Sequence, residues 1–171
     1  MKKTLILLLL FPLLILGQTP FMKGEKLFKE GKFDEAQPLL ENYLKSNPNH
    51  LRTLEYLGDI AGHNKTWDES ISYYKKLKTL KPTEANYFYK YGGALGMKSL
   101  EVNKFKALGM IGEVRSSFEK AIQLNPKHIE ARWALIELNL QLPGIVGGSE
   151  VKAIKYSAEL RELSPVDGYL S

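Results

Sequence analysis

The side chains that could act in catalysis or metal binding are few and scattered along the chain. The sequence contains no cysteine and three histidines, His50, His63 and His128. A metal centre or nucleophilic site needs several such groups at a fixed spacing, and we find no His-Glu-x-x-His pattern, nucleophile elbow or aspartate-rich cation loop. The absence of cysteine also excludes disulfides, thiolate ligands and a lipid-anchored N-terminal cysteine. The sequence therefore predicts no catalytic activity, no metal and no other cofactor.

A glycine-rich turn, Pro143–Ser149, is the one motif that could bind a small ligand. A turn of this kind that opens a helix can hold an anion. It lacks the Gly-Lys-Ser/Thr ending of a nucleotide-binding loop, so we favour a structural role, in which Pro143 and Gly144 end one helix and Ser149 caps the next. A small-ligand or anion-binding accessory protein that uses this turn is the alternative hypothesis for function.

Prolines that end apolar helical stretches recur along the chain. They are Pro48, Pro82, Pro126 and Pro165, and the intervals between them are 34, 44 and 39 residues. His50 and His128 each lie two residues after one of these prolines, so we interpret them as parts of a repeated turn rather than as ligands. A period of this length indicates a solenoid of stacked helical units.

Each unit is predicted to contain two helices. The second helix of each carries an apolar stripe at helical spacing: Phe33, Ala36, Leu40 and Tyr43; Trp67, Ile71, Tyr74 and Leu77; Ile111, Val114, Phe118 and Ala121; and, more weakly, Ala153, Ile154, Ser157 and Leu160. Gly58 and Gly92 occupy the same position in two of the preceding helices. Because glycine inside a helix costs about 1 kcal/mol, its recurrence predicts a close approach of two helices there. Thr66 and Glu69 predict a capping box.

The segment 51–84 resembles a tetratricopeptide repeat of standard length. Its matching residues are Leu54, Leu57, Gly58, Ala61, Trp67, Tyr74, Leu77 and Pro82, whereas Ser70 replaces the usual alanine. The first unit matches at Gly24, Leu27, Gly31, Phe33, Ala36, Leu40 and Pro48, and the last two match less well, at Ala121 and Pro126 and at Ala153 and Pro165. The resemblance implies an all-α fold, a right-handed α-α superhelix of about four helix pairs. The units are expected at about 17–50, 51–84, 85–128 and 129–167, the last two with insertions.

The first 17 residues are predicted to be a secretory signal. Lys2 and Lys3 precede a twelve-residue apolar run, which is shorter than the roughly 20 residues that span a bilayer. Cleavage after Gly17 would leave residues 18–171 as the repeat domain. We therefore expect export to the periplasm or the outside of a bacterial cell. An N-terminally membrane-tethered scaffold is the alternative, and membrane contact is expected only if the segment stays uncleaved.

Composition agrees with one folded domain. Of 171 residues, 44% are hydrophobic and 25% are charged, which suffices for a buried core. The formal net charge of +5 falls to +3 without Lys2 and Lys3. This mild charge, together with predicted export, argues against a nucleic-acid partner.

The larger insertion covers residues 97–112 and is expected to lengthen the third helix pair or add a turn to it. One hypothesis is a protrusion that presents lysines to a partner, namely Lys98, Lys104 and Lys106. The other is a locally packed elbow, which is favoured by apolar residues suited to burial: Leu100, Val102, Phe105 and Leu108.

Resemblance to the family implies a concave groove, lined by the first helix of each pair, that holds an extended peptide or a helix. Mapped onto this sequence, the candidate partner-binding residues are Arg52, Glu55, Asp59, His63, Asn86, Tyr89, Lys90, Trp133, Glu137, Leu140 and Gln141. Tyr89 and Trp133 beside mixed charges are typical of protein-binding anchors, although Trp133 packed under the insertion is the alternative. The family's carboxylate clamp, built from lysine, asparagine and arginine, is not reproduced here. Glu25, Tyr56 and Asn86 stand where clamp residues would be expected, which argues against capture of a chaperone tail.

Few residues follow Pro165, so the polar capping helix that usually ends such a solenoid is not expected. An uncapped end exposes an apolar face, and we expect self-association or a partner there. The sequence as a whole predicts an exported, non-catalytic protein-interaction module or scaffold that binds a peptide or protein in its groove.

Overall fold

The structure, a computed structural model, describes residues 19–164. In chain order this part of the chain forms α1 (Pro20–Lys29), α2 (Phe33–Ser46), α3 (Leu51–His63), α4 (Trp67–Leu80), α5 (Ala85–Glu101), α6 (Lys104–Leu124), α7 (Ile129–Gln141), the short 3-10 helix η1 (Gly144–Val146) and α8 (Glu150–Leu163). The predicted signal, residues 1–17, and the chain from Pro165 onward lie outside the described residues.

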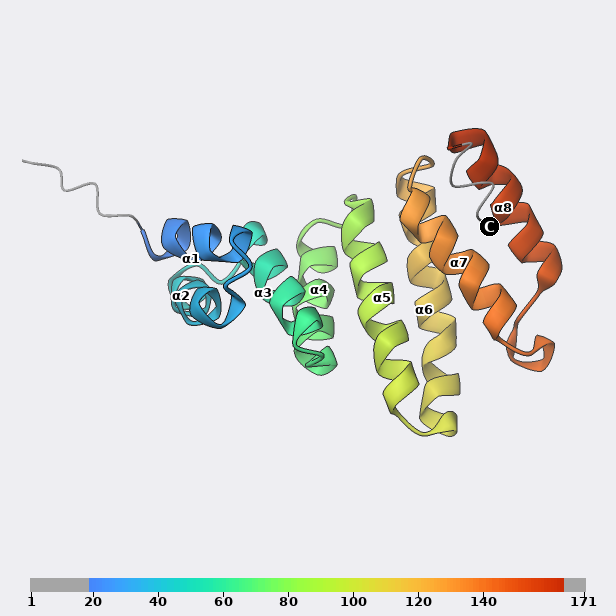
Figure 1. Cartoon of the computed structure of the whole chain (residues 1–171), viewed down its shortest axis with the longest axis horizontal. Helices are drawn as coiled ribbons and strands as arrows, with labels where there is room; N and C mark the ends of the chain where they lie inside the picture. Colours follow the sequence, from blue (N-terminus) through green and yellow to red (C-terminus); the bar gives the residue numbers. More distant parts are fainter. Residues whose placement is uncertain (1–18, 165–171) are drawn as a thin grey trace, which may run out of the picture.

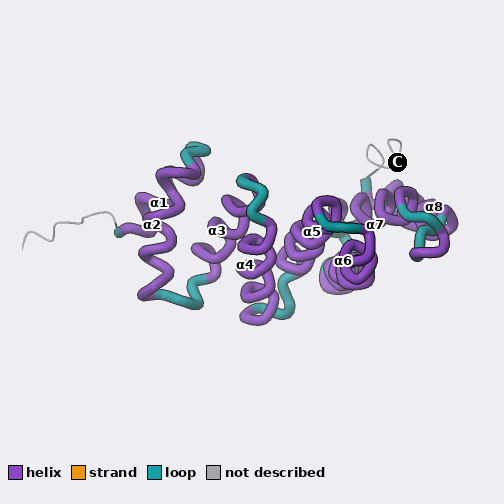
Figure 2. Tube along the Cα trace, turned by 90° about the horizontal axis from the view of Figure 1, so that it is seen from below, coloured by secondary structure: helices purple, strands orange, loops and turns teal. Residues whose placement is uncertain are grey.

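Successive helices form four pairs that stack side by side into an elongated solenoid (Figures 1 and 2). Each helix packs against the next along the chain, and contacts also join α1 to α3 and α5 to α7. The prediction of an all-α solenoid of about four helix pairs is therefore confirmed. No helix in the described range is long and apolar enough to cross a membrane.

The repeated histidines cap helices. His50 Nδ1 accepts a hydrogen bond from the Thr53 N–H at 3.3 Å, and His128 Nδ1 accepts one from the Ala131 N–H at 3.2 Å. Each bond satisfies an amide that the first turn of a helix leaves free. These two side chains thus start α3 and α7 in the same way, which agrees with a role in the repeated turn.

The predicted capping box is wrong. The Thr66 side chain accepts no hydrogen bond from the first turn of α4. Its hydroxyl lies 3.0 Å from the Glu69 carboxylate and 3.3 Å from the Ala61 carbonyl, so it acts as a donor. The hydroxyl therefore links the end of α3 to the start of α4.

The recurrent glycines bring paired helices together, as predicted. A Cβ atom at Gly58 would lie 2.9 Å from the Tyr74 ring of α4, and one at Gly92 would lie 2.9 Å from the Phe118 ring of α6. Real Cβ contacts essentially never come this close, so each glycine gives an aromatic ring room to cross its helix.

The third helix pair is longer than the second and projects from the solenoid. Helix α5 has 17 residues and α6 has 21, compared with 13 in α3 and 14 in α4. Figure 1 shows the α5–α6 hairpin reaching beyond the turns of the neighbouring pairs. The expected lengthening of this pair is confirmed.

The packed-elbow hypothesis for this hairpin is wrong. Leu100 is 74% exposed, Phe105 88% and Leu108 48%. These residues lie at or near the turn of the hairpin and remain largely exposed, whereas Val102 in the turn is half-buried. The turn end of α5 is nevertheless fixed to the start of α4, because Trp67 Nε1 donates to Glu101 at 2.6 Å and Lys98 forms an ion pair with Asp68.

Candidate partner-binding groove

The first helices of the pairs form one wall of the solenoid, and side chains from α3, α5 and α7 meet there. The predicted groove residues lie on these three helices. The structure divides them into a charged half between α3 and α5 and an apolar half between α5 and α7.

The charged half is centred on Lys90 of α5. Its ammonium lies 2.9 Å from a Glu55 carboxylate oxygen and 2.8 and 2.9 Å from the two oxygens of Asp59. Burial alone would lower the pKa of Lys90, but its hydrogen bonds to Asp59 and Glu55 raise it overall. Tyr74 donates to Asp59 at 2.5 Å, and burial together with that carboxylate raises the pKa of Tyr74. Three predicted site residues are thus brought together, and they satisfy one another across the second and third helix pairs.

A second charged cluster surrounds Glu25 at the start of the solenoid. Its carboxylate accepts from the Tyr56 hydroxyl at 2.8 Å and lies 3.2 Å from both Arg52 and Lys29. The Tyr56 hydrogen bond lowers the pKa of Glu25, and the two cations add to this effect. Burial and the carboxylate raise the pKa of Tyr56 to about 12. The predicted residue Arg52 therefore lies at the edge of an ion-pair network.

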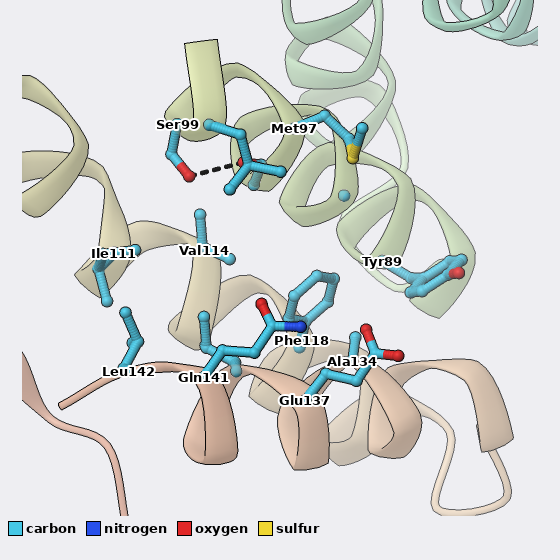
Figure 3. Close-up of a pocket in the computed structure, with 14 residues that line it drawn as sticks. Tyr89, Met97, Ser99, Ile111, Val114, Phe118, Ala134, Glu137, Gln141 and Leu142 are labelled. Carbon is cyan, nitrogen blue, oxygen red and sulfur yellow. Dashed lines mark hydrogen bonds between the residues drawn. The ribbon is translucent and has the colours of Figure 1, made fainter. Parts of the chain in front are cut away.

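The apolar half contains a pocket of about 400 Å³ between α5, α6 and α7 (Figure 3). Its lining consists of Tyr89, Gly93, Gly96, Met97, Ser99, Leu100, Ile111, Val114, Phe118, Ala134, Glu137, Leu138, Gln141 and Leu142. A Cβ at Gly93 would meet nothing within 4 Å, and one at Gly96 would touch only Val114 at 3.7 Å. The pocket is open because these two positions of α5 carry no side chain.

Three predicted residues reach this pocket: Tyr89, Glu137 and Gln141. The Tyr89 ring packs near Phe118 and His128, with centroids 5.9 and 5.0 Å apart. Burial raises the pKa of Tyr89, and the carboxylates of Glu130 and Glu137 add to this effect. Glu137 is exposed and forms no ion pair with any described residue. An apolar pocket beside a free carboxylate is suited to a peptide in which an apolar residue stands next to a lysine or arginine.

The remaining predicted residues lie elsewhere. Leu140 is 59% exposed and lies outside the pocket. Asn86 lines a separate hollow between the starts of α5 and α7. His63 packs edge-on against Phe33, with ring centroids 4.6 Å apart.

Trp133 does not lie in the groove pocket. It is half-buried and packs against Ile136, Ala153 and Leu160, in the cluster that joins α7 to α8. Trp133 therefore packs against the core of the fourth pair and does not line the groove pocket.

Sequence reasoning missed the residues that make the pocket. Gly93, Gly96 and Met97 belong to the lengthened α5, and Ile111 and Val114 face them from α6. Closely spaced glycines, Gly92, Gly93 and Gly96, were the available signal. The sequence-based prediction covers only Gly92, although Gly96 also has a counterpart in the neighbouring unit, Gly62.

The backbone N–H groups of the glycine-rich turn form hydrogen bonds within the protein. The N–H groups of Val146, Gly147 and Gly148 donate to carbonyls of Pro143 and Gly144, and that of Ser149 donates to the Asn139 carbonyl at 3.0 Å. A Cβ at Gly148 would lie 1.7 Å from the Leu142 carbonyl oxygen, so only glycine fits there.

Helix α8 then begins with Ser149 as its N-cap, as expected. The turn is also fixed from outside, because Arg115 donates to Asn139 Oδ1 and to the Gly147 carbonyl, each at 2.8 Å. These contacts give the turn a structural role and leave little donor capacity for an anion. In the described residues, no group of three or more acidic, histidine or cysteine side chains is placed to hold a metal.

Comparison with known proteins agrees with this architecture. A family model described as tetratricopeptide repeat matches residues 21–85. A crystal structure of MamA protein is 25% identical and has a TM-score of 0.70, with 90% of this chain and 78% of that chain covered. MamA from Desulfovibrio magneticus RS-1 is 18% identical with a TM-score of 0.69, covering 86% of this chain and 75% of that one. No curated protein sequence matches the chain significantly.

The matched family segment spans α1 to α4, and the solved structures extend the similarity over the later pairs. Residues 21–85 thus resemble the tetratricopeptide repeat family, and the described chain as a whole has the all-α solenoid fold of such repeats.

Proposed function

We propose that this protein is an exported, non-catalytic interaction module whose concave groove binds a peptide or helix of another protein. The observation that carries the proposal is the apolar pocket between α5, α6 and α7. In the charged half, Glu55 and Asp59 already form ion pairs with Lys90. The pocket, in contrast, offers an unfilled apolar surface, and Glu137 beside it forms no ion pair with any described residue. We infer that the partner places an apolar side chain in the pocket and a lysine or arginine near Glu137.

Site-specific photo-crosslinking tests this proposal. A photoreactive phenylalanine at Gly93 would project into the mouth of the pocket, because Gly93 lines the pocket and an added Cβ there meets nothing within 4 Å. The matched control carries the same group at Lys75, an exposed position on the second-helix α4. We expect a discrete protein adduct from position 93 in the native envelope and none from position 75. Adducts from position 75 alone would count against the groove.

Glu137 supplies a second test of the same site. Once a crosslinked partner is identified, Glu137→Gln should weaken its binding by about tenfold at low salt, since one charge pair is lost. Glu130→Gln, a nearby exposed carboxylate outside the pocket lining, is the control. Equal effects of the two variants would indicate general charge attraction without a defined subsite.

Export is the second part of the proposal, and it rests on the sequence of residues 1–17. We infer that the apolar segment directs the chain out of the cytoplasm and is removed near Gly17. Intact mass of the protein recovered from the cell envelope tests this directly. A mature chain that begins near Gln18 is expected, and a full-length chain held in the membrane would instead favour the tethered scaffold.

The fourth helix pair offers a surface for self-association. Val151 and Ile154 lie one turn apart on α8 and are 78% and 68% exposed. We infer that a second copy or a partner covers these residues. Sedimentation velocity should detect a concentration-dependent oligomer that Ile154→Glu converts to monomer. A wild-type chain that stays monomeric across the range would contradict this contact.

A further inference from the structure

The projecting tip of the α5–α6 hairpin carries the most exposed aromatic residue of the described chain. Phe105 is 88% exposed and Leu100, across the turn, is 74% exposed. Leu108 follows Phe105 by three residues on α6, which places both on one face of the helix, and it is 48% exposed. The tip extends past the turns of the neighbouring pairs (Figure 1).

Two free cations flank the exposed ring. Lys104 and Lys106 are exposed and form no ion pair with any described residue. Segment 97–112 holds a single carboxylate, Glu101, and this group accepts a hydrogen bond from Trp67 of α4. The third lysine, Lys98, is paired with Asp68. The end of the hairpin is therefore both apolar and positively charged.

The turn at the tip is held by a helix cap and projects from the solenoid (Figure 1). Asn103 caps α6 by accepting from the Lys106 N–H at 3.1 Å, which fixes the turn that carries Phe105. The N-terminal end of α6 at this turn has the polarity that favours anions. A projecting apolar tip can bury its side chains only in a partner that deforms around it or holds a matching cavity.

We propose that this tip inserts Phe105 and Leu100 into the interface of an anionic lipid bilayer, with Lys104 and Lys106 at the level of the lipid phosphates. Apolar residues flanked by lysines are the composition of segments that lie in a membrane interface. Each lysine near an anionic surface strengthens binding by about fivefold, an effect that salt screens. Leu100 also lines the groove pocket, whereas Lys104, Phe105 and Lys106 do not, so changes at these three residues test the tip separately from the groove.

The absence of cysteine allows a reporter to be placed at the tip alone. Gly109 is exposed, lies one turn from Phe105, and has open space around an added Cβ. The full chain with Gly109→Cys, labelled with the polarity-sensitive dye NBD, would be mixed with vesicles of phosphatidylcholine alone or with added phosphatidylglycerol. The control label is Lys127→Cys, an exposed residue in the α6–α7 turn at the other end of α6. Because the readout is local, attachment of the chain through residues 1–17 would not by itself produce a signal at position 109.

We expect the label at position 109 to shift to the blue with the anionic vesicles, and to be quenched by brominated acyl chains, while the label at 127 does not change. Lys104→Glu with Lys106→Glu should raise the lipid concentration needed by at least about tenfold. Lys75→Glu with Lys76→Glu makes the same change in net charge on α4 and should leave the lipid concentration needed unchanged. Phe105→Ser should reduce the shift while the helical circular dichroism is retained.

Three results would overturn the proposal. One is a label at 109 that remains in water with anionic vesicles. Another is a shift of equal size with neutral vesicles that is indifferent to Lys104 and Lys106. The third is a shift that needs no vesicles and grows with protein concentration, which would instead identify contact between copies of the chain.

Discussion

His128 couples the start of α7 to pH. Its ring accepts from the Ala131 N–H, which requires an unprotonated Nδ1, and the side chain is only 7% exposed. Burial lowers the pKa of His128; Glu130, 3.1 Å away, opposes this, and Arg132 adds to it. A lowered folded-state pKa means that the stabilisation is present above the unfolded value of about 6.5 and is lost as the pH falls through the folded value.

We therefore predict a pH-dependent stability that His128→Asn removes in part. Asparagine keeps a side-chain acceptor at the N-cap and does not titrate. Thermal unfolding followed by circular dichroism should show a smaller fall in Tm for the variant than for wild type between about pH 7.5 and 5. Parallel Tm curves for the two proteins would contradict a role for this ring.

Adjacent glycines in α5 are predicted to respond in opposite ways to alanine. Gly92→Ala places a Cβ 2.9 Å from the Phe118 ring and 3.0 Å from Ser117 Cβ, so it should lower the free energy of unfolding by about 1–3 kcal/mol. Gly93→Ala meets nothing within 4 Å and should be neutral or raise that free energy by up to about 1 kcal/mol. Urea titration of the pair checks this, and similar effects at both positions would refute the assigned packing.

At the scale of elements, Arg115 links α6 to the turn that begins α8. Arg115→Met removes the hydrogen bonds to Asn139 and Gly147 and leaves the buried Asn139 amide oxygen without that donor. We expect a loss of about 1–3 kcal/mol. Hydrogen exchange should rise most in residues 143–163, and Lys155→Met, an exposed change on α8, should alter nothing there. If Arg115→Met raised exchange equally along the whole chain, or not at all in residues 143–163, other contacts would hold the turn.

The elements were predictable where the sequence carries a local signal. Helix-ending prolines, apolar stripes and the glycines at 58 and 92 are repeated, so the pairs up to α4 follow from spacing alone. The added length of α5 and α6 also followed. The exposure of the hairpin tip could not be predicted, because an apolar stripe such as that of Phe105 and Leu108 does not reveal whether a neighbouring helix reaches far enough to cover it.

The candidate site was also predictable only in part, because a local pattern does not reveal which residues of other helices lie nearby. Positions such as Tyr89 and Glu137 follow from the repeat register, and they do line the pocket. The pocket itself depends on an absence of side chains at Gly93 and Gly96 facing residues of α6 and α7. Trp133 turned out to pack against α8, because the fourth pair has its own core to fill. Such pairings join residues tens of positions apart, and no local pattern reports them.

At the scale of the whole molecule, the solenoid separates two kinds of surface. Its wall of first helices is tied together by ion pairs such as Lys90 with Glu55 and Asp59, and each helix pair mainly contacts its neighbours. The pocket lies in this wall, whereas the Phe105 tip projects away from the solenoid body. Leu100 belongs to both surfaces, because it lines the pocket and is exposed beside the tip.

The account rests most heavily on the pocket as the place where a polypeptide is held. Its most direct test is the affinity of the partner crosslinked from position 93 for two matched variants, Gly93→Leu and Gly109→Leu, measured by isothermal titration calorimetry. Both glycines have open space at Cβ, so both variants should fold, but only leucine at position 93 enters the pocket. We predict at least about a tenfold loss of affinity for Gly93→Leu and none for Gly109→Leu. Wild-type affinity in Gly93→Leu would contradict the account.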